Sequence, residues 1–463
     1  MKNQSVLNKI ESLLPHTLGI SAPVRKIIWY TVVVFAGFYL CYILQVDLIL
    51  PLFLVLIVIY LNALYRDINQ ATYKLINLSF LFVLIFVASY IMVQQGASVF
   101  YIPFCAIPML ATILFNELMV SLLLTAATAL AVAIIAGNNF YLGVLFLISG
   151  MAASLLVYGA RKRVTILRAG LVVGLVQLVS LFFVDNFCFF DSKRYLILLL
   201  NGFSCGIIAL GILPIFEYLF GTITNISLLE LADFNHPLLN RLMLEAPGTY
   251  HHSLIVGNLS EAACTVVGAN ALLARIGAYY HDVGKLQKPE YFSENQSLTG
   301  NKHDSLSPSM SKLVIMNHVK DGVEMAKKYR LNSRLIDFIL SHHGNSLVYY
   351  FYRRALENVE EDQEVAEEGF RYPGPKPNTK EIAIVMLADS VEAAMRTLKD
   401  PASDAIKDLV HKIINNKFID GQFDECDLTL KDLEKIASVF IRILSGIYHT
   451  RVNYPDEKQE THS

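Results

Sequence analysis

The chain has 463 residues, of which 54% are hydrophobic and only 17% are charged, and its formal net charge is −2. This composition is too apolar for an ordinary soluble protein and indicates membrane-spanning helices. The near-neutral charge argues against a nucleic acid polymer as a partner, and the six scattered cysteines form no CxxC pair. We therefore expect neither a disulfide framework nor a cysteine zinc site.

The N-terminal segment, residues 1–26, is amphipathic and carries mixed charges. It lacks the continuous apolar stretch that is typical of a secretory signal peptide. We therefore expect the first apolar block to be a retained anchor, preceded by a short cytoplasmic segment.

A transmembrane domain is predicted over residues 27–220, because apolar blocks near the ~20 residues needed to cross a bilayer follow one another there. Charged residues are nearly absent inside these blocks, which argues against an ion pathway. Only QVD separates the first two blocks. The eight blocks lie at 27–44, 46–65, 76–94, 98–116, 118–136, 139–158, 166–185 and 194–220.

The connections between these blocks alternate in charge. QVD, QQGAS and GNN carry no Lys or Arg, and only Lys193 and Arg194 disturb the alternation. By the positive-inside rule we expect a multi-pass protein of the cell membrane whose N-terminus and residues 221–463 are cytoplasmic. The basic residues that set this orientation are Arg25, Lys26, Arg66, Lys74, Arg161, Lys162 and Arg163.

Residues 221–463 change to mixed charged sequence with apolar residues three and four apart, which predicts an all-helical domain. Eleven of the twelve histidines follow residue 221. Two adjacent pairs are notable, His281–Asp282 in AYYHDVGK and His342–His343 in ILSHHG, because imidazole and carboxylate suit Fe, Mn, Zn or Ni. Neighbouring helix residues point about 100° apart, so an adjacent pair can contact two ions, and an aspartate can bridge them.

The ordered series H…HD…D resembles the HD phosphohydrolases, and in particular the seven-transmembrane HD family of cyclic di-AMP phosphodiesterases. The resemblance covers essentially all of residues 235–455. It rests on LEAPGTYHHSLIVGNLSEAA, YYHDVGKLQKPEYFSENQ, NKHDSLSPSMSKLVIMNHVKDG, ILSHHG, FRYPGPKPNTKEIAIVMLADSVEAA, DGQFDECDLTLKDLEKI and GIYHTRVNYP.

The resemblance implies a centre of two divalent metal ions, iron or manganese. One ion would be held by His252, His281, Asp282 and Asp389, and the other by His318, His342 and His343 with Asp282 bridging. We prefer His252 over His251 because it shares a helix face with apolar residues. A metal-bound hydroxide would attack the phosphodiester. Asp282 and Lys285 are the predicted catalytic residues, and the alternative for Lys285 is a solvated residue at a helix end.

Two further segments could line a nucleotide pocket or could equally serve as structural caps and braces. In NKHDSLSP the candidates are Asn301, His303 and Asp304. Before YPGPKP they are Arg371 and Tyr372, an anion-binding and an aromatic side chain.

These observations predict a membrane-anchored phosphodiesterase that hydrolyses cyclic di-AMP to pApA, the adenine being implied by the resemblance alone. The alternatives are an HD phosphohydrolase acting on another cyclic dinucleotide or nucleotide, and a non-catalytic nucleotide-binding membrane receptor. Family members commonly carry an extracellular domain after the first span, for which QVD leaves no room. Besides cyclic di-AMP, membrane lipid is an expected partner, and a homodimer is left open.

Overall fold

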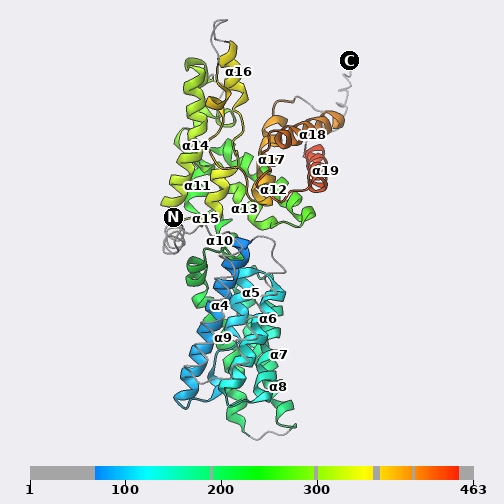
Figure 1. The fold of residues 1–463 in the computed structure, drawn as a ribbon. Coiled ribbons are helices and arrows are strands. Elements are labelled where there is room, and N and C mark those ends of the chain that lie inside the picture. Colours follow the sequence, from blue (N-terminus) through cyan, green and yellow to red (C-terminus); the bar gives the residue numbers. More distant parts are fainter. Residues whose placement is uncertain (1–67, 188–190, 297–300, 358–364, 399–401, 448–463) are drawn as a thin grey trace, which may run out of the picture. The chain divides into compact units, whose positions relative to one another are not determined.

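The computed structural model describes residues 68–187, 191–296, 301–357, 365–398 and 402–447 (Figure 1). These residues form helices joined by turns, and an isolated bridge between Leu347 and Arg371 is the sole β pairing among them. The predicted all-α fold is therefore confirmed. The chain divides into two compact units, 1–227 and 228–463. Residues 1–26 and the predicted spans 27–44 and 46–65 lie outside the described residues.

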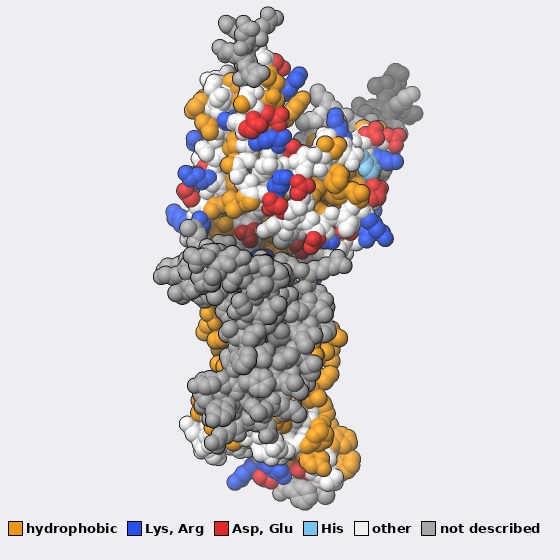
Figure 2. All heavy atoms as spheres, viewed as in Figure 1, with side chains coloured by type: hydrophobic (Ala, Val, Ile, Leu, Met, Phe, Trp, Pro, Cys, Tyr) orange, Lys and Arg blue, Asp and Glu red, His pale blue; other side chains and the backbone are white. Residues whose placement is uncertain are grey.

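Within the described part of the first unit, five helices are long and apolar enough to cross a membrane. Figure 2 shows hydrophobic side chains over most of the visible described surface of this unit. That surface is what a helix bundle in lipid requires, since no water is available to solvate polar groups. The helices are α4 (Ile68–Gln94), α6 (Leu118–Ile135), α7 (Phe140–Val157), α8 (Arg163–Val184) and α9 (Ser192–Phe220).

The predicted span 98–116 is wrong as a continuous helix. It consists of the short turn η2 (Val99–Tyr101), an extended stretch and the ten-residue helix α5 (Ala106–Phe115). Pro103 explains the interruption, because a proline removes a backbone donor and biases the preceding residue away from the helical region. Asn201 on α9 compensates by donating to the carbonyl oxygens of Phe100 and Ile102, at 3.2 and 3.0 Å.

This broken segment still crosses the bundle. Lys74, near the start of α4, forms an ion pair with Glu117, which directly precedes α6. The first residues of α4 and α6 therefore lie at the same end of the unit, although α4 runs about 30 Å to the opposite end in between. The chain must return across the membrane thickness between residues 95 and 117, as the sequence predicted.

Helices α8 and α9 pack through glycines. A Cβ atom on Gly202 would lie 2.2 Å from the backbone nitrogen of Gly174, and one on Gly170 would lie 2.8 Å from the carbonyl oxygen of Gly202. Glycines four residues apart let two helix backbones approach closely, which is a common basis of helix association in membranes.

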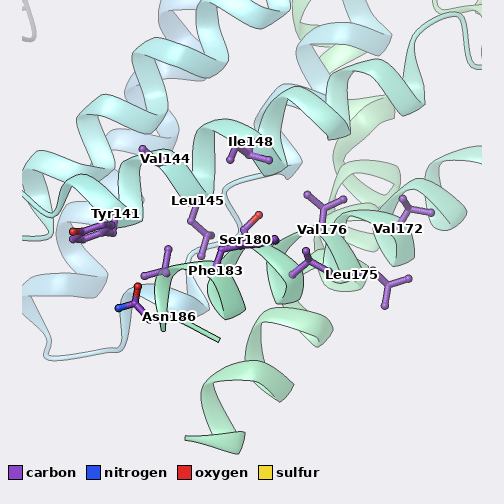
Figure 3. A pocket seen from close by; sticks show the side chains of 12 residues that line it. Tyr141, Val144, Leu145, Ile148, Val172, Leu175, Val176, Ser180, Phe183 and Asn186 are labelled. Carbon is purple, nitrogen blue, oxygen red and sulfur yellow. The ribbon is translucent and has the colours of Figure 1, made fainter. Parts of the chain in front are cut away.

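An apolar groove of about 710 Å³ lies between α7 and α8 (Figure 3). Its lining comes from one face of each helix, including Ile148 of α7 and Val176 of α8, with Tyr141 and Asn186 at its polar positions. None of its lining residues offers a carboxylate, an imidazole or a thiol. The groove therefore lacks the side chains from which most metal sites are built.

The second unit is a helical domain built around α17. Residues Ile382–Ala388 of this helix are buried on every side. The continuous apolar run is therefore that of a helix in the middle of the core, and not that of an amphipathic helix. The helices from the boundary between the units onward are α10 (Asn225–Leu231), which spans that boundary, α11 (Pro237–Glu245), α12 (Pro247–Val267), α13 (Ala271–Tyr280), α14 (Pro308–Lys328), α15 (Ser333–Ser341), α16 (Tyr349–Glu357), α17 (Lys380–Met395), α18 (Ser403–Ile419) and α19 (Leu430–Ile447).

Candidate metal centre

The HD dipeptide lies where the chain leaves α13. His281 follows the last residue of that helix, and Asp282 precedes the short 3₁₀ helix η3 (Val283–Gln287). Gly284 lets this turn touch α14, because a Cβ atom there would lie 1.8 Å from the carbonyl oxygen of His318. The sequence therefore places the two metal-ligand-type residues at a turn that contacts a third.

One group of candidate ligands surrounds the Oδ2 atom of Asp282. His252 on α12 and Asp389 on α17 join the HD pair, and one ligand atom from each of the four residues lies within 4.8 Å of the others. His281 Nε2 is 3.3 Å from Asp282 Oδ2, and His252 Nε2 is 3.1 Å from Asp389 Oδ1. His252 is buried, whereas its neighbour His251 is exposed.

A second group surrounds the other oxygen of the same carboxylate. His318 Nε2 on α14 is 3.3 Å from Asp282 Oδ1, and His342 Nε2, just after α15, is 3.7 Å from it. His343 completes this group. The structure thus brings all seven predicted ligands together and places Asp282 between the two sets.

Several buried atoms of the two groups lack hydrogen-bond partners. They are Nε2 of His252, Nε2 of His281 and Oδ1 of Asp282, whereas Oδ2 of Asp282 is contacted by Lys285. Burying an ionised carboxylate without a donor is costly, so such atoms indicate a ligand. Cations fit this donor set, and these residues could hold metal ions.

The imidazole rings of His252, His281, His318 and His342 are oriented so that Nε2 faces the centre, whereas His343 directs Nδ1 toward Asp389. His281 Nδ1 lies 2.6 Å from the carbonyl oxygen of Ala278, and His342 Nδ1 lies 2.9 Å from that of Ile339. A ring that donates through Nδ1 presents the Nε2 lone pair as a ligand atom. The backbone of the ligand-bearing elements therefore selects the tautomer suited to metal binding.

His281 and His318, one histidine from each group, differ in pKa. Burial opposes the charged form of His281, but the Asp282 carboxylate outweighs it and raises the pKa of His281 to about 10. For His318 burial dominates and lowers the pKa to about 4. Burial opposes ionisation of Asp282 too, yet His281 and Lys285 hold its pKa well below the usual range. The Asp282 carboxylate of the centre is therefore ionised, and His281 carries a positive charge that His318 does not.

Lys285 forms two ion pairs. Its Nζ atom lies 2.7 Å from Asp282 Oδ2 and 2.7 Å from Glu294 Oε1. The α-helix ends before Lys285, and the 3₁₀ turn that follows directs the ammonium group to Asp282. The solvated alternative for Lys285 does not apply.

Glu392 was missed by the sequence reasoning. It is 1% exposed, contacts His252 Nδ1 and receives two hydrogen bonds from Arg396, at 2.7 and 2.9 Å. A carboxylate behind a ligating imidazole fixes the orientation of the ring. The available signal was the spacing of three between Asp389 and Glu392, which puts both on one helix face.

Two family models match the chain. "7TM receptor with intracellular HD hydrolase" matches residues 27–224, and "HD domain" matches residues 249–394. The cyclic-di-AMP phosphodiesterase PgpH of Bacillus subtilis (strain 168) is 45% identical over 324 residues, covering 69% of this chain and 45% of that protein. PgpH of Listeria monocytogenes serotype 1/2a (strain 10403S) is 39% identical over 395 residues, covering 83% of this chain and 54% of that protein.

This chain belongs to the seven-transmembrane HD family. The resemblance expected from the motifs is confirmed, and the family match together with the apolar helices identifies a membrane protein. The chain spans about half the length of these curated relatives. The crystal structure of the L. monocytogenes PgpH HD domain in complex with cyclic-di-AMP is 47% identical, with a TM-score of 0.45, and covers 47% of this chain and 100% of that one.

In this HD domain, the residues of the segment NKHDSLSP have structural partners. The side chain of Asn301 caps η6 (Lys302–Ser305) by accepting from the backbone of His303, at 3.0 Å. His303 is buried and contacts the carbonyl oxygen of Tyr291 at 2.8 Å, and Asp304 pairs with Arg354 at 3.5 Å. These contacts favour the structural alternative for all three residues.

The other two predicted substrate contacts have different surroundings. The guanidinium of Arg371 is held by Glu367, at 2.6 Å, and by Asp420, at 2.9 Å, so it acts as a brace. The ring of Tyr372 stacks on that of His343, with centroids 4.3 Å apart. Of this pair, Tyr372 is the residue that lies at the candidate metal centre.

Proposed function

We propose that this chain is a membrane-anchored, metal-dependent phosphodiesterase that hydrolyses cyclic di-AMP to pApA. In this reaction the oxygen of water adds to one phosphorus, the bond from that phosphorus to the 3′ oxygen breaks, and the released oxygen takes up a proton. The observation that carries the proposal is the position of Asp282, which presents one oxygen to each of two histidine groups. The names of the two PgpH relatives supply the substrate.

The ligand sets would hold two divalent ions, iron or manganese. His252, His281, Asp282 and Asp389 form one set, and Asp282, His318, His342 and His343 form the other. Mixed nitrogen and oxygen donors suit these ions. When bound, such ions polarise the phosphodiester and lower the pKa of water.

The chain's own residues orient and enclose this centre. Lys285 holds Asp282 in place, and Glu392 holds the ring of His252. The His343 side chain is 22% exposed and that of Asp389 is 11% exposed, whereas the other five ligand side chains are at most 4% exposed. The substrate therefore reaches the centre from the side of His343 and Asp389, where Tyr372 also lies.

The proposal includes the predicted arrangement in the cell membrane. Residues 27–220 would cross the membrane, while residues 1–26 and 221–463 would face the cytosol, where a nucleotide messenger is found. The basic connections support this orientation by the positive-inside rule. Homodimerisation stays a prediction, which the mass of the solubilised chain would test.

The direct test uses the full chain, solubilised and loaded with Mn²⁺ or Fe²⁺. We expect hydrolysis of cyclic di-AMP in preference to cyclic di-GMP and nucleoside triphosphates. Asp282→Ala should reduce kcat by about 10³-fold or more, because both ligand sets lose a member. Asp404→Ala, an exposed carboxylate on α18, is the matched control.

Each alternative function predicts a different result in this experiment. Undiminished hydrolysis by the Asp282→Ala variant would contradict the two-metal site. Preferred turnover of another nucleotide would reassign the substrate, and binding of cyclic di-AMP without turnover by metal-loaded protein would support a receptor.

A further inference from the structure

A rim of polar side chains lies beside His343. It is assembled from three stretches that are distant in sequence, namely 343–346, 371–372 and 417–422. The backbone of Tyr372 donates to the carbonyl oxygen of Ser346 at 3.0 Å, which fixes the first two stretches together. Because Tyr372 also stacks on His343, this rim is continuous with the open side of the metal centre.

Gln422 locks the third stretch to the first. Its side chain accepts from the backbone of Asn345, at 3.2 Å, and donates to Asn345 Oδ1, at 2.6 Å, and to Asp420 Oδ2, at 2.7 Å. The residue is fully buried, so these bonds are shielded from water. The end of α18 is therefore held in a fixed position against the residues that follow His343.

Gly344 is required for this contact. It has a φ of +54°, and a Cβ atom there would lie 2.3 Å from Gln422 Oε1. Both the backbone conformation and the available space therefore exclude a side chain. The rim is built into the fold at the residue next to a candidate ligand.

Lys417, in the last turn of α18, points into this rim. Its ammonium group donates to Ser346 Oγ at 2.8 Å. Among the described residues no carboxylate oxygen lies within 4.0 Å of it. Burial lowers the pKa of Lys417, and the more distant carboxylates of Asp389 and Asp420 offset this only in part. Asp420 is already engaged by Arg371.

This half-buried cation differs from the other cations near the site. Lys285 and Arg371 are each held by two carboxylates, whereas Lys417 has one neutral partner among the residues that the structure describes and keeps donor capacity for another acceptor. Burying an ammonium group without an anion is costly. An anion that arrives with the substrate would relieve that cost.

We propose that Lys417 binds the phosphate group of the substrate that is not cleaved. This inference rests on the proposed function, since a cyclic dinucleotide carries two phosphodiesters on opposite sides of its ring. With one phosphate at Asp282, the second faces outward on the side where the centre is open. Lys417 is positioned there by Ser346, and its charge is not neutralised by a protein carboxylate.

The test measures cyclic di-AMP hydrolysis by the metal-loaded full chain. Lys417→Met should raise KM at least tenfold while kcat changes less than threefold, because the lost contact is made equally in the ground state and the transition state. Lys417→Arg keeps the charge and should restore KM to within about threefold of the wild type. Lys412→Met, an exposed lysine of the same helix, should leave both constants unchanged.

Four outcomes would overturn the inference. They are an unchanged KM, a fall in kcat with KM unchanged, a loss of bound metal in Lys417→Met, and failure of Lys417→Arg to restore KM. If Lys417→Met does not fold, Lys417→Gln carries the same expectation, because its amide can still donate to Ser346. Wild-type protein that does not hydrolyse cyclic di-AMP would refute the proposed function itself, whereas an active wild type with normal KM in the variant would refute only the role of Lys417.

Discussion

Buried polar groups differ in their hydrogen-bond partners between the membrane unit and the HD domain. In the membrane unit, the hydroxyl groups of Thr112, Thr125 and Thr128 each donate to a carbonyl oxygen four residues earlier in the same helix. In the HD domain, the carboxylate of Asp282 is buried, its Oδ1 accepts no hydrogen bond, and its Oδ2 is contacted by the ammonium group of Lys285. A neutral hydroxyl can be satisfied within its own helix, but an ionised carboxylate cannot.

The two units show how a ligand site differs from isolated buried polar atoms that only lack a hydrogen-bond partner. The membrane unit also has buried atoms without partners, such as Asn77 Nδ2, Ser154 Oγ and Gln177 Oε1. These atoms are neutral and lie on three different helices. The HD domain also has unpaired neutral atoms, such as Oγ of Ser253 and Ser260, but its unpaired atoms of His252, His281 and Asp282 are grouped around one carboxylate. Convergence and charge therefore identify the site.

The largest expected effect would test how far the membrane unit depends on close packing. Gly202→Val should destabilise it by about 3 kcal/mol, because the new side chain meets the backbone of Gly174 and neither helix can yield cheaply. Gly211→Val is the matched control on the same helix, since a Cβ atom there meets no other atom within 4 Å. Thermal unfolding of the solubilised full chain provides the measurement. Equal melting temperatures for the two variants would show that the glycine contact is dispensable.

A second variant would sharpen the account of the HD domain. Glu392→Gln should weaken metal affinity about 10- to 100-fold, because the ring of His252 loses its carboxylate partner while the ligands themselves remain. Competition with a chelator measures the affinity, and Glu434→Gln, on the surface of α19, serves as control. Unchanged affinity would mean that Glu392 only packs against α12.

The smallest expected effect is a pH dependence of metal binding that comes from the protonation of His281. In the metal-free protein the pKa of His281 is raised to about 10, so this imidazole is protonated at pH 7, whereas His318, with a pKa lowered to about 4, is neutral. The stability that protonated His281 gives the metal-free fold is present below its unfolded value of about 6.5 and is lost as the pH rises toward 10.

A ligating imidazole must be neutral, so metal binding at the His281 set should release a proton, and affinity there should rise about tenfold per pH unit from pH 7 to 9. Calorimetric titration in buffers of different ionisation enthalpy counts the protons. Affinity that is independent of pH over this range would contradict the charge difference between His281 and His318.

Much of the candidate site could be predicted from sequence, because its ligands occur in short motifs with local spacing. His281–Asp282 and His342–His343 are adjacent in the chain, and the family pattern relates them to His252, His318 and Asp389. The spacing from Asp389 places Glu392 on the ligand face of its helix, but its role depends on a contact with His252, 140 residues away, and that of Lys417 on a contact with Ser346, 71 residues away. The broken crossing was missed although Pro103 is visible in the sequence, because a span predicted from a run of apolar residues gives no weight to a proline inside the run.

The contact between Gly284 and the carbonyl oxygen of His318 determines how rigid the metal centre is. It joins the HD turn to α14 by main-chain atoms, close to the ligands of both groups. No flexible side chain separates the two elements, so rotamer changes cannot alter the spacing between them. The distance across the centre can therefore vary only as much as the peptide backbone moves. A lysine or glutamate side chain that reached across a cleft would allow much larger variation.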